Sequence, residues 1–85
     1  MPGYGRPVKI NPDDPEYPFV QLAGLLRARI ESGELTGRMP TVLQLSNESG
    51  LSSGTVQRSL ALLREEGLIV AMPGRGTFVK RGAGS

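Results

Sequence analysis

Hydrophobic residues recur at helical spacing in the first third of the chain. Between Tyr17 and Ser32 the apolar positions follow one another at i, i+3, i+7 and i+11, which places them on one stripe of a helix. The stripe consists of Phe19, Leu22, Leu26 and Ile30. Pro18 suits the first turn, because its missing N–H would have no partner there. Gly33 favours termination, so the pattern predicts a helix from Tyr17 to Ser32.

A second helix is predicted from Thr41 to Ser49. Thr41 and Gln44 form a T-x-x-Q capping box, in which each side chain accepts a hydrogen bond from the backbone N–H of the other residue. Leu45 faces inward, and Gly50 favours the left-handed turn that ends the helix.

The third predicted helix starts at its N-cap, Ser52, and runs to Glu66. Its buried face consists of Val56, Leu60 and Leu63, with Ser59 between them. Helical geometry directs Gly54, Arg58, Ala61 and Glu65 to the opposite side, with Ser53 and Gln57 on one flank. Only a very short turn separates this helix from the preceding one, and the pair predicts a helix-turn-helix unit.

The hydrophobic pattern changes after the third helix. Residues 68–72 are apolar and residues 77–80 contain β-branched and aromatic side chains, so both segments predict strands. The sequence Pro73-Gly74-Arg75-Gly76 between them is typical of a turn. Three helices followed by a hairpin predict a fold that is mainly α with a small β-hairpin, the winged helix-turn-helix, with residues 73–76 at the tip of the wing.

Composition limits the chemistry that this chain can perform. The 85 residues contain no cysteine and no histidine, which removes thiolate nucleophiles, the usual zinc ligands and the commonest general base. Glu65 and Glu66 are sequence neighbours whose side chains diverge on a helix, and we interpret them as a solvated face rather than a catalytic pair. We predict that the chain is not an enzyme and uses no cofactor or metal.

Length and hydropathy predict one domain without a membrane segment. We place this domain at residues 17–81, between a flexible arm at 1–16, rich in proline and glycine, and a flexible tail at 82–85. No stretch approaches the roughly 20 apolar residues that span a bilayer, and residues 1–11 lack the apolar stretch of a signal peptide. We therefore expect a cytoplasmic protein with no membrane partner.

Charge is unevenly distributed along the chain, whose net charge is +2. Acidic residues cluster at 13–16 and none follows Glu66, whereas the last part carries Arg75, Lys80 and Arg81. This asymmetry suits a chain whose one end meets a polyanion, although three terminal cations can equally be solvated. A helix fits the major groove of B-DNA, and the hairpin beside it can bring Arg75 to the backbone or minor groove.

A series of motifs runs through the chain in order. They are PFVQLA at 18–23, IESGEL at 30–35, MPT at 39–41 with Leu45, GLS at 50–52 with Thr55-Val56, Leu60, Leu63, EGL at 66–68 and GRGTFV at 74–79. Together they resemble the DNA-binding domain of the GntR family of bacterial transcription regulators, over about residues 18–80.

The resemblance implies a regulator, specifically a repressor, that binds double-stranded DNA sequence-specifically. Helix 52–66 would lie in the major groove and the wing at 73–76 on the backbone or minor groove. The candidate DNA-binding residues are Thr41, Ser52, Ser53, Gly54, Thr55, Gln57, Arg58, Arg75 and Gly76. A homodimer on a two-fold site is also implied. The effector-binding domain that normally follows in this family is not found in this chain.

The chain departs from the family at three positions that usually carry arginine. These positions hold Leu43, Ser53 and Gln57. Because each lost phosphate contact lowers the salt slope of DNA binding by about 0.9, we expect weak binding by a monomer. The other hypothesis is recognition of an unusual site through Ser53, Thr55, Gln57 and Arg58. Gln57 can pair bidentately with adenine.

Several assignments have alternatives. Ser53 and Thr55 suit capping of the third helix as well as DNA contact, and Arg75 also suits a solvated hairpin tip. Arg6 and Lys9 in the arm suit either solvent or the DNA backbone. The alternative function is a winged-helix module that binds a protein through its arginine-poor face, or an architectural role in replication or excision of a mobile element.

Overall fold

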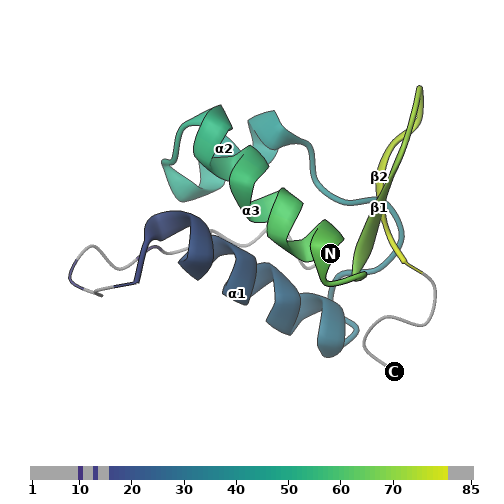
Figure 1. The fold of residues 1–85 in the computed structure, drawn as a ribbon, viewed down its shortest axis with the longest axis horizontal. Helices are drawn as coiled ribbons and strands as arrows, with labels where there is room; N and C mark the ends of the chain where they lie inside the picture. Colours follow the sequence, from purple (N-terminus) through teal and green to yellow (C-terminus); the bar gives the residue numbers. More distant parts are fainter. Residues whose placement is uncertain (1–9, 11–12, 14–15, 81–85) are drawn as a thin grey trace.

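Three helices precede a two-stranded antiparallel hairpin in the computed structural model, which describes residues 10, 13 and 16–80. The elements are α1 (Pro18–Glu31), α2 (Val42–Ser49), α3 (Ser53–Glu65), β1 (Ile69–Met72) and β2 (Gly76–Val79). Figure 1 shows α3 lying over α1, with α2 near the start of α3 and the hairpin projecting at the other end. This arrangement confirms the predicted winged helix-turn-helix. The rest of the predicted arm, with Arg6 and Lys9, and the tail at 82–85 with Arg81 lie outside the described residues.

The predicted helices extend one residue too far wherever a capping residue was counted as helical. Tyr17, Thr41 and Ser52 are N-caps with extended backbone, and Ser32 and Glu66 are the C-caps of α1 and α3. The third helix is therefore 53–65 rather than 52–66. Gly50 has a φ of 76°, which confirms the left-handed turn between α2 and α3.

The core lies where α1 and α3 pack together and is closed by α2 and the loops. Its buried hydrophobic residues are Leu22, Ala23, Leu26, Ile30, Leu35, Met39, Leu45, Val56, Leu60, Leu63 and Ile69. Of the predicted stripe on α1, Phe19 is only half-buried, whereas the other members are buried. Full burial of one such side chain contributes about 1.5–3 kcal/mol relative to exposure. Because α3 buries Val56, Leu60 and Leu63 against α1 and the rest of the core, turning the helix would expose them. The packing therefore determines which side of α3 remains outside.

The hairpin has the predicted turn at its tip. Its register pairs Ile69 with Val79, Val70 with Phe78, Ala71 with Thr77 and Met72 with Gly76. The Arg75 N–H donates to the Met72 carbonyl oxygen over 2.9 Å, and Gly74 has a φ of 77°. Pro73 followed by a residue with positive φ is the arrangement of a type II turn. β1 is one residue shorter than its predicted range, whereas β2 is shifted by one residue, so that it includes Gly76 and not Lys80.

The connector between α1 and α2 joins the hairpin as an additional edge. The Met39 N–H donates to the Thr77 oxygen and the Val79 N–H donates to the Gly37 oxygen, both over 2.7 Å. Arg38 forms an antiparallel bridge with Phe78 between these bonds. The sequence predicts only an extended connector here. Its pairing with β2 ties the base of the wing to the segment that leads into α2.

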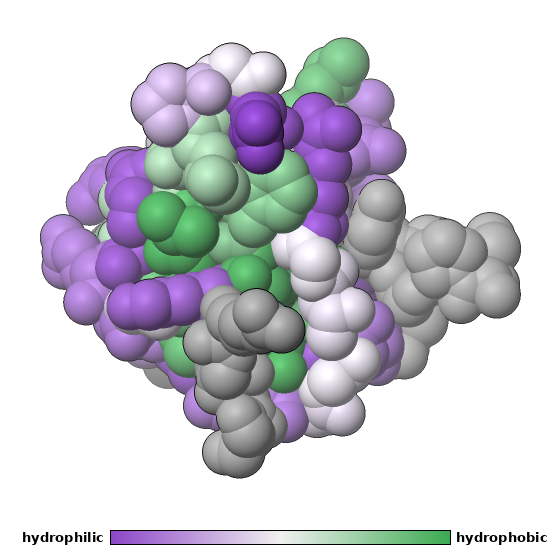
Figure 2. Space-filling model, turned by 90° about the vertical axis from the view of Figure 1, so that its right-hand side faces the viewer, coloured by the Kyte–Doolittle hydropathy of each residue, from purple (hydrophilic) through white to green (hydrophobic). Residues whose placement is uncertain are grey.

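Only the base of the wing is anchored in the core. Ile69 is buried, whereas Val70, Ala71 and Met72 are exposed along the rest of β1. Figure 2 views the molecule from the hairpin end and shows apolar surface across the middle of this face, with hydrophilic residues beside it. The hairpin therefore projects from the helical body, as a wing must in order to reach a partner.

Candidate nucleic-acid interface

One side of α3 remains uncovered by the rest of the domain. Ser53, Gly54, Gln57 and Arg58 are exposed, whereas Val56 and Ser59 are fully buried on the opposite side. The structure thus confirms the predicted orientation of α3. The assignment of these exposed residues to DNA stays a prediction.

The first turn of α3 is closed by a cap that involves two of the candidate residues. The Ser52 hydroxyl oxygen accepts a hydrogen bond from the Thr55 N–H over 3.2 Å, and the two hydroxyl groups lie 3.0 Å apart. Thr55 is half-buried, whereas Ser53 is exposed and takes no part in these bonds. Capping therefore explains Ser52 and Thr55, and Ser53 is the hydroxyl that faces outward.

The start of α2 carries the predicted capping box. The Gln44 N–H donates to Thr41 Oγ1 over 3.1 Å, and the Thr41 N–H donates to Gln44 Oε1 over 2.8 Å. Leu43, in the same turn, is 69% exposed. An apolar side chain therefore stands on the surface where the family resemblance leads one to expect an arginine.

Arg58 leans from α3 toward the beginning of α1. Its Cζ atom lies 4.3 Å from the centroid of the Phe19 ring, which places the guanidinium over the aromatic face. The Tyr17 ring stacks on Phe19 with centroids 6.0 Å apart, and the neighbouring Ser59 hydroxyl donates to the Phe19 carbonyl oxygen over 2.7 Å. No spacing in the sequence links residue 19 to residue 58, so this contact could not be predicted.

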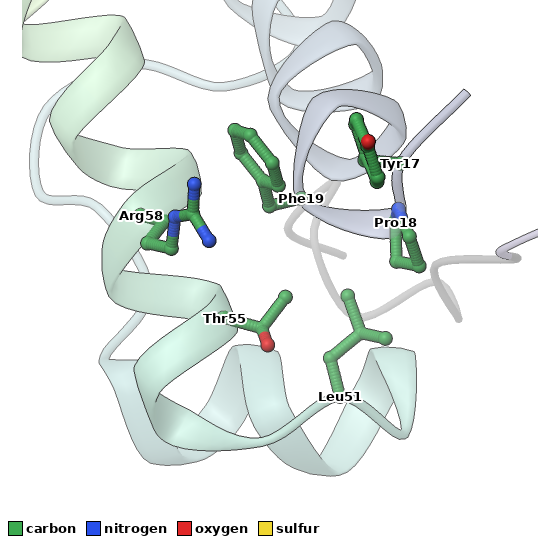
Figure 3. Close-up of a pocket in the computed structure, with 6 residues that line it drawn as sticks. All are labelled: Tyr17, Pro18, Phe19, Leu51, Thr55 and Arg58. Atoms are coloured by element: carbon green, nitrogen blue, oxygen red, sulfur yellow. The ribbon is translucent and has the colours of Figure 1, made fainter.

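A surface hollow of about 510 Å³ opens beside this stack. It lies between the start of α1 and the start of α3, and it is lined by Tyr17, Pro18, Phe19, Leu51, Thr55 and Arg58. Figure 3 shows these side chains arranged around the space between the two helices. The hollow combines aromatic and aliphatic walls with one cation.

The wing carries Arg75 at its exposed tip, and Arg38 of the connector lies beside β2. Gly76 has a φ of 110°, and a Cβ atom built there would lie 3.3 Å from Arg38 Nε and Nη2. The Arg38 side chain therefore lies against a strand position that has no side chain. A second hollow, of about 210 Å³, separates Arg38 and the wing from Thr41 at the start of α2. Sequence analysis missed Arg38, whose one signal was its place in the connector before α2.

Two arginines of α1 form ion pairs with carboxylates. Arg27 Nε and Nη2 donate to the two carboxylate oxygens of Glu66, each over 2.7 Å. These hydrogen bonds lower the pKa of the Glu66 carboxyl and raise the pKa of Arg27. Glu66 is exposed, as its interpretation as part of a solvated face predicts, but its side chain also links the end of α3 to α1, which the sequence did not predict.

Arg29 lies deeper, between two further acids. It is 9% exposed, and its Nε atom lies 3.5 Å from a carboxylate oxygen of Glu34. Arg29 Nη1 and Glu48 Oε1 are buried without a hydrogen-bond partner among the described residues. Burial raises the pKa of the Glu48 carboxyl, and the charge of Arg29 opposes this shift.

The remaining cations of the described segment have no carboxylate partner. They are Arg38, Arg58, Arg64, Arg75 and Lys80. These residues come from α3, from the wing and from the connector that pairs with it. Positive charge is therefore neutralised on α1 by carboxylates and retained on the elements around the exposed face of α3.

The described part of the chain includes no group of three or more side chains suited to hold a metal ion. None of its helices has the length and apolar character needed to cross a membrane.

The fold and the surface define a winged helix-turn-helix domain whose outer face suits a polyanion. Residues 19–79 match the family described as "Bacterial regulatory proteins, gntR family". The chain therefore belongs to the gntR family of bacterial regulatory proteins. This match agrees with the expectation that the chain is a regulator and not an enzyme.

Two curated relatives are similar in sequence. The chain is 41% identical over 63 residues to the uncharacterized HTH-type transcriptional regulator RB1450 of Rhizobium meliloti, covering 72% of this chain and 26% of that protein. It is 34% identical over 76 residues to the HTH-type transcriptional repressor NagR of Bacillus subtilis, covering 87% of this chain and 31% of that protein. The chain thus spans about a quarter to a third of the length of these relatives.

Solved structures share the fold. YtrA from Sulfolobus acidocaldarius, a GntR-family transcription factor, aligns with a TM-score of 0.78 at 28% identity, covering 86% of this chain and 79% of that one. The AraR DNA-binding domain in complex with operator ORE1 aligns with a TM-score of 0.73 at 25% identity, covering 84% of this chain and 89% of that one.

Proposed function

We propose that this chain is the DNA-binding part of a sequence-specific transcriptional repressor. In this proposal α3 lies in the major groove of double-stranded DNA, and the wing tip contacts the backbone or minor groove through Arg75. The observation that carries the proposal is the uncovered side of α3, with unpaired cations on α3 and on the wing. The repressor NagR and the operator-bound AraR domain, both similar to this chain, support it.

Base recognition is assigned to the outward residues of α3. Gln57 is exposed and presents both an amide donor and an acceptor, which match the N7 and N6 edge of adenine. Ser53 is the exposed hydroxyl next to it on the first turn. The remaining candidates at the helix starts and the wing, Thr41, Ser52, Gly54, Thr55 and Gly76, lie on segments that would face the DNA backbone.

The proposed assembly is a homodimer on a two-fold DNA site. One α3 reads only part of a site, and a pair of domains on two half-sites gains both affinity and specificity. Because the proposed ligand is the bacterial chromosome, we place the protein in the cytoplasm.

The function is tested by selecting bound duplexes from a random pool and measuring affinity against salt by fluorescence anisotropy. Gln57→Ala is expected to relax preference at one base pair by about 1–3 kcal/mol. Arg75→Ala is expected to weaken all sequences equally and lower the salt slope by about 0.9. Arg27→Gln removes the same charge from α1, outside the proposed contact surface, and serves as the control. A reporter placed behind the selected site should lose expression when the chain is present.

The alternative function, a winged-helix module that binds a protein, predicts no binding to duplex DNA. Leu43, at 69% exposure, is the feature that favours a protein partner. If the wild-type chain shows no salt-sensitive binding to any duplex at about 50 mM salt, where backbone contacts are strong, the proposed function is wrong and the protein-binding module becomes the better account.

A further inference from the structure

Arg58 is held by an aromatic ring rather than by an acid. Its Cζ atom stands 4.3 Å above the Phe19 ring, and within the part of the chain that the structure describes no hydrogen bond or ion pair engages its N–H groups. Arg27, in contrast, donates two hydrogen bonds to Glu66. The Phe19 ring holds the guanidinium of Arg58 in place, and its donors and charge stay available.

This geometry suits one kind of ligand. All five N–H donors of a guanidinium lie in its plane, and those of Arg58 make no hydrogen bond or ion pair within the described residues. Two of these donors match two oxygens of a phosphate in a bidentate contact. The ring also reduces the conformational freedom that Arg58 would otherwise lose when it binds.

Phe19 is itself held in place relative to α3. The Ser59 hydroxyl, 0% exposed, donates to the Phe19 carbonyl oxygen over 2.7 Å, and the Tyr17 ring stacks on the outer side of Phe19. Arg58 and Ser59 are neighbours on α3, so one turn of this helix both anchors Phe19 and places a cation over it. The position of Arg58 is therefore fixed by contacts between α1 and α3.

The hollow next to Arg58 has walls that match the other part of a nucleotide backbone. Pro18 and Leu51 present aliphatic surface and Tyr17 an exposed ring, on both sides of a space of about 510 Å³ (Figure 3). A deoxyribose is largely apolar on its carbon face and carries a phosphate at each end. Aliphatic walls beside a single unpaired cation are complementary to that combination.

We propose that this hollow receives the sugar-phosphate backbone of one DNA strand, and that Arg58 binds a phosphate rather than a base edge. The proposal rests on the proposed function and deepens it. With α3 in the major groove, the strand that borders the groove runs past the flank of α3 that faces α1. Gln57 and Arg58 are then divided by role: Gln57 reads a base, and Arg58 fixes the register of the duplex.

The first test combines phosphate modification with substitution of Arg58. Ethylation interference on the selected duplex is expected to mark a flanking phosphate for the wild-type chain, and this mark should disappear for Arg58→Ala. Arg58→Ala should also lower the salt slope by about 0.9 and weaken every sequence by the same factor. Arg58→Lys keeps the charge without the planar fork, so it should retain the slope while binding less tightly.

The second test asks whether Phe19 acts through Arg58. Phe19→Leu is expected to weaken DNA binding about twofold to fivefold, the range of an exposed cation–π contact, and to have no further effect in the Arg58→Ala background. Thermal melting of each variant reports the folded fraction. If Phe19→Leu does not fold, the interference pattern and the Arg58 variants decide the question alone.

Two results would overturn this proposal while leaving the proposed function intact. One is a changed base preference for Arg58→Ala with an unchanged salt slope, which would make Arg58 a base-reading residue. The other is an unchanged ethylation pattern for Arg58→Ala, which would assign the flanking phosphate to another residue. Failure of the wild-type chain to bind any duplex would instead refute the proposed function, and this proposal with it.

Discussion

The ion pair between Arg27 and Glu66 is expected to contribute measurably to the stability of the contact between α1 and the end of α3. The perturbation is a double-mutant cycle with Arg27→Gln, Glu66→Gln and the double variant. Glu66 is the C-cap of α3 and lies 39 residues from Arg27 in the chain. The pair therefore links the two helices whose packing presents the outer face of α3.

The magnitude follows from geometry and exposure. Both N–O distances are 2.7 Å, and the bidentate arrangement is the strongest form of an arginine–carboxylate pair. The Arg27 and Glu66 side chains remain 34% and 39% exposed, so solvent screens the attraction. Exposed pairs contribute about 0.2–1 kcal/mol, and the good geometry places this one near the upper end. A loss of about 1 kcal/mol lowers the melting temperature by about 4–8 °C in a domain of this size.

The dependence on pH has a definite sign. The hydrogen bonds from Arg27 hold the pKa of Glu66 below its ordinary value in the folded chain. The stabilisation is therefore complete above the unfolded carboxyl pKa of about 4.3 and is lost as the pH falls through the folded pKa. The coupling energy should be measurable at pH 7 and should decline as the pH is lowered below about 4.

The assay is thermal or urea unfolding of the wild type, the two single variants and the double variant, at pH 7 and at a pH below about 4. Glu65→Gln provides the control, because Glu65 is the neighbouring exposed carboxylate and forms no ion pair in the described segment. A coupling energy of zero at pH 7 would refute the argument. A coupling energy that is the same at acid pH would show that the two side chains interact by packing rather than by charge.

Two further predictions concern Gly76 on the wing and Glu48, a half-buried acid on α2. Gly76→Ala should destabilise the domain by about 1–2 kcal/mol, because φ at 110° is strained for any side chain and the added Cβ meets Arg38. Gly54→Ala in α3 is the control and should not destabilise the domain, because the added Cβ meets nothing within 4 Å. Similar melting temperatures of the Gly76→Ala and Gly54→Ala variants would contradict the prediction for Gly76. Glu48→Gln should stabilise the domain slightly at pH 7, because burial raises the pKa of Glu48 and so disfavours its charged form. The extra stability of Glu48→Gln, measured by unfolding at a series of pH values, should vanish once Glu48 of the wild-type chain is protonated. Extra stability that persists in acid would show that burial of the charged carboxylate is not its cause.

The fold was predictable because its signals are local. The capping box of Thr41 and Gln44, the left-handed Gly50 and the turn at Pro73-Gly74 each determine backbone conformation within four residues. The predicted helix boundaries were wrong by one residue at the caps. A capping residue indicates where a helix begins or ends but lies outside the helical backbone itself. The outward orientation of α3 followed from the spacing of its buried residues.

The contacts that complete the candidate site are of another kind. Arg58 meets Phe19, Arg27 meets Glu66, and the connector at Arg38 pairs with β2, all across long stretches of chain. Each depends on the angle and distance at which two elements pack, and no sequence period encodes these quantities. Sequence analysis could therefore name Arg58 as a candidate and place it on the side of the helix away from the core, but it could not predict that the side chain leans onto Phe19.

The two ways of holding an arginine distinguish the scaffold from the proposed contact surface. A carboxylate fixes a guanidinium but cancels its charge and occupies its donors, as Glu66 does for Arg27. An aromatic ring fixes the guanidinium but leaves its charge and its N–H donors available, as Phe19 does for Arg58. A domain that binds a polyanion needs rigid cations whose charge is still available. The ring therefore suits the flank of α3 and the carboxylate suits the rear of α1, and exchanging the two arrangements would weaken DNA binding without removing a single arginine.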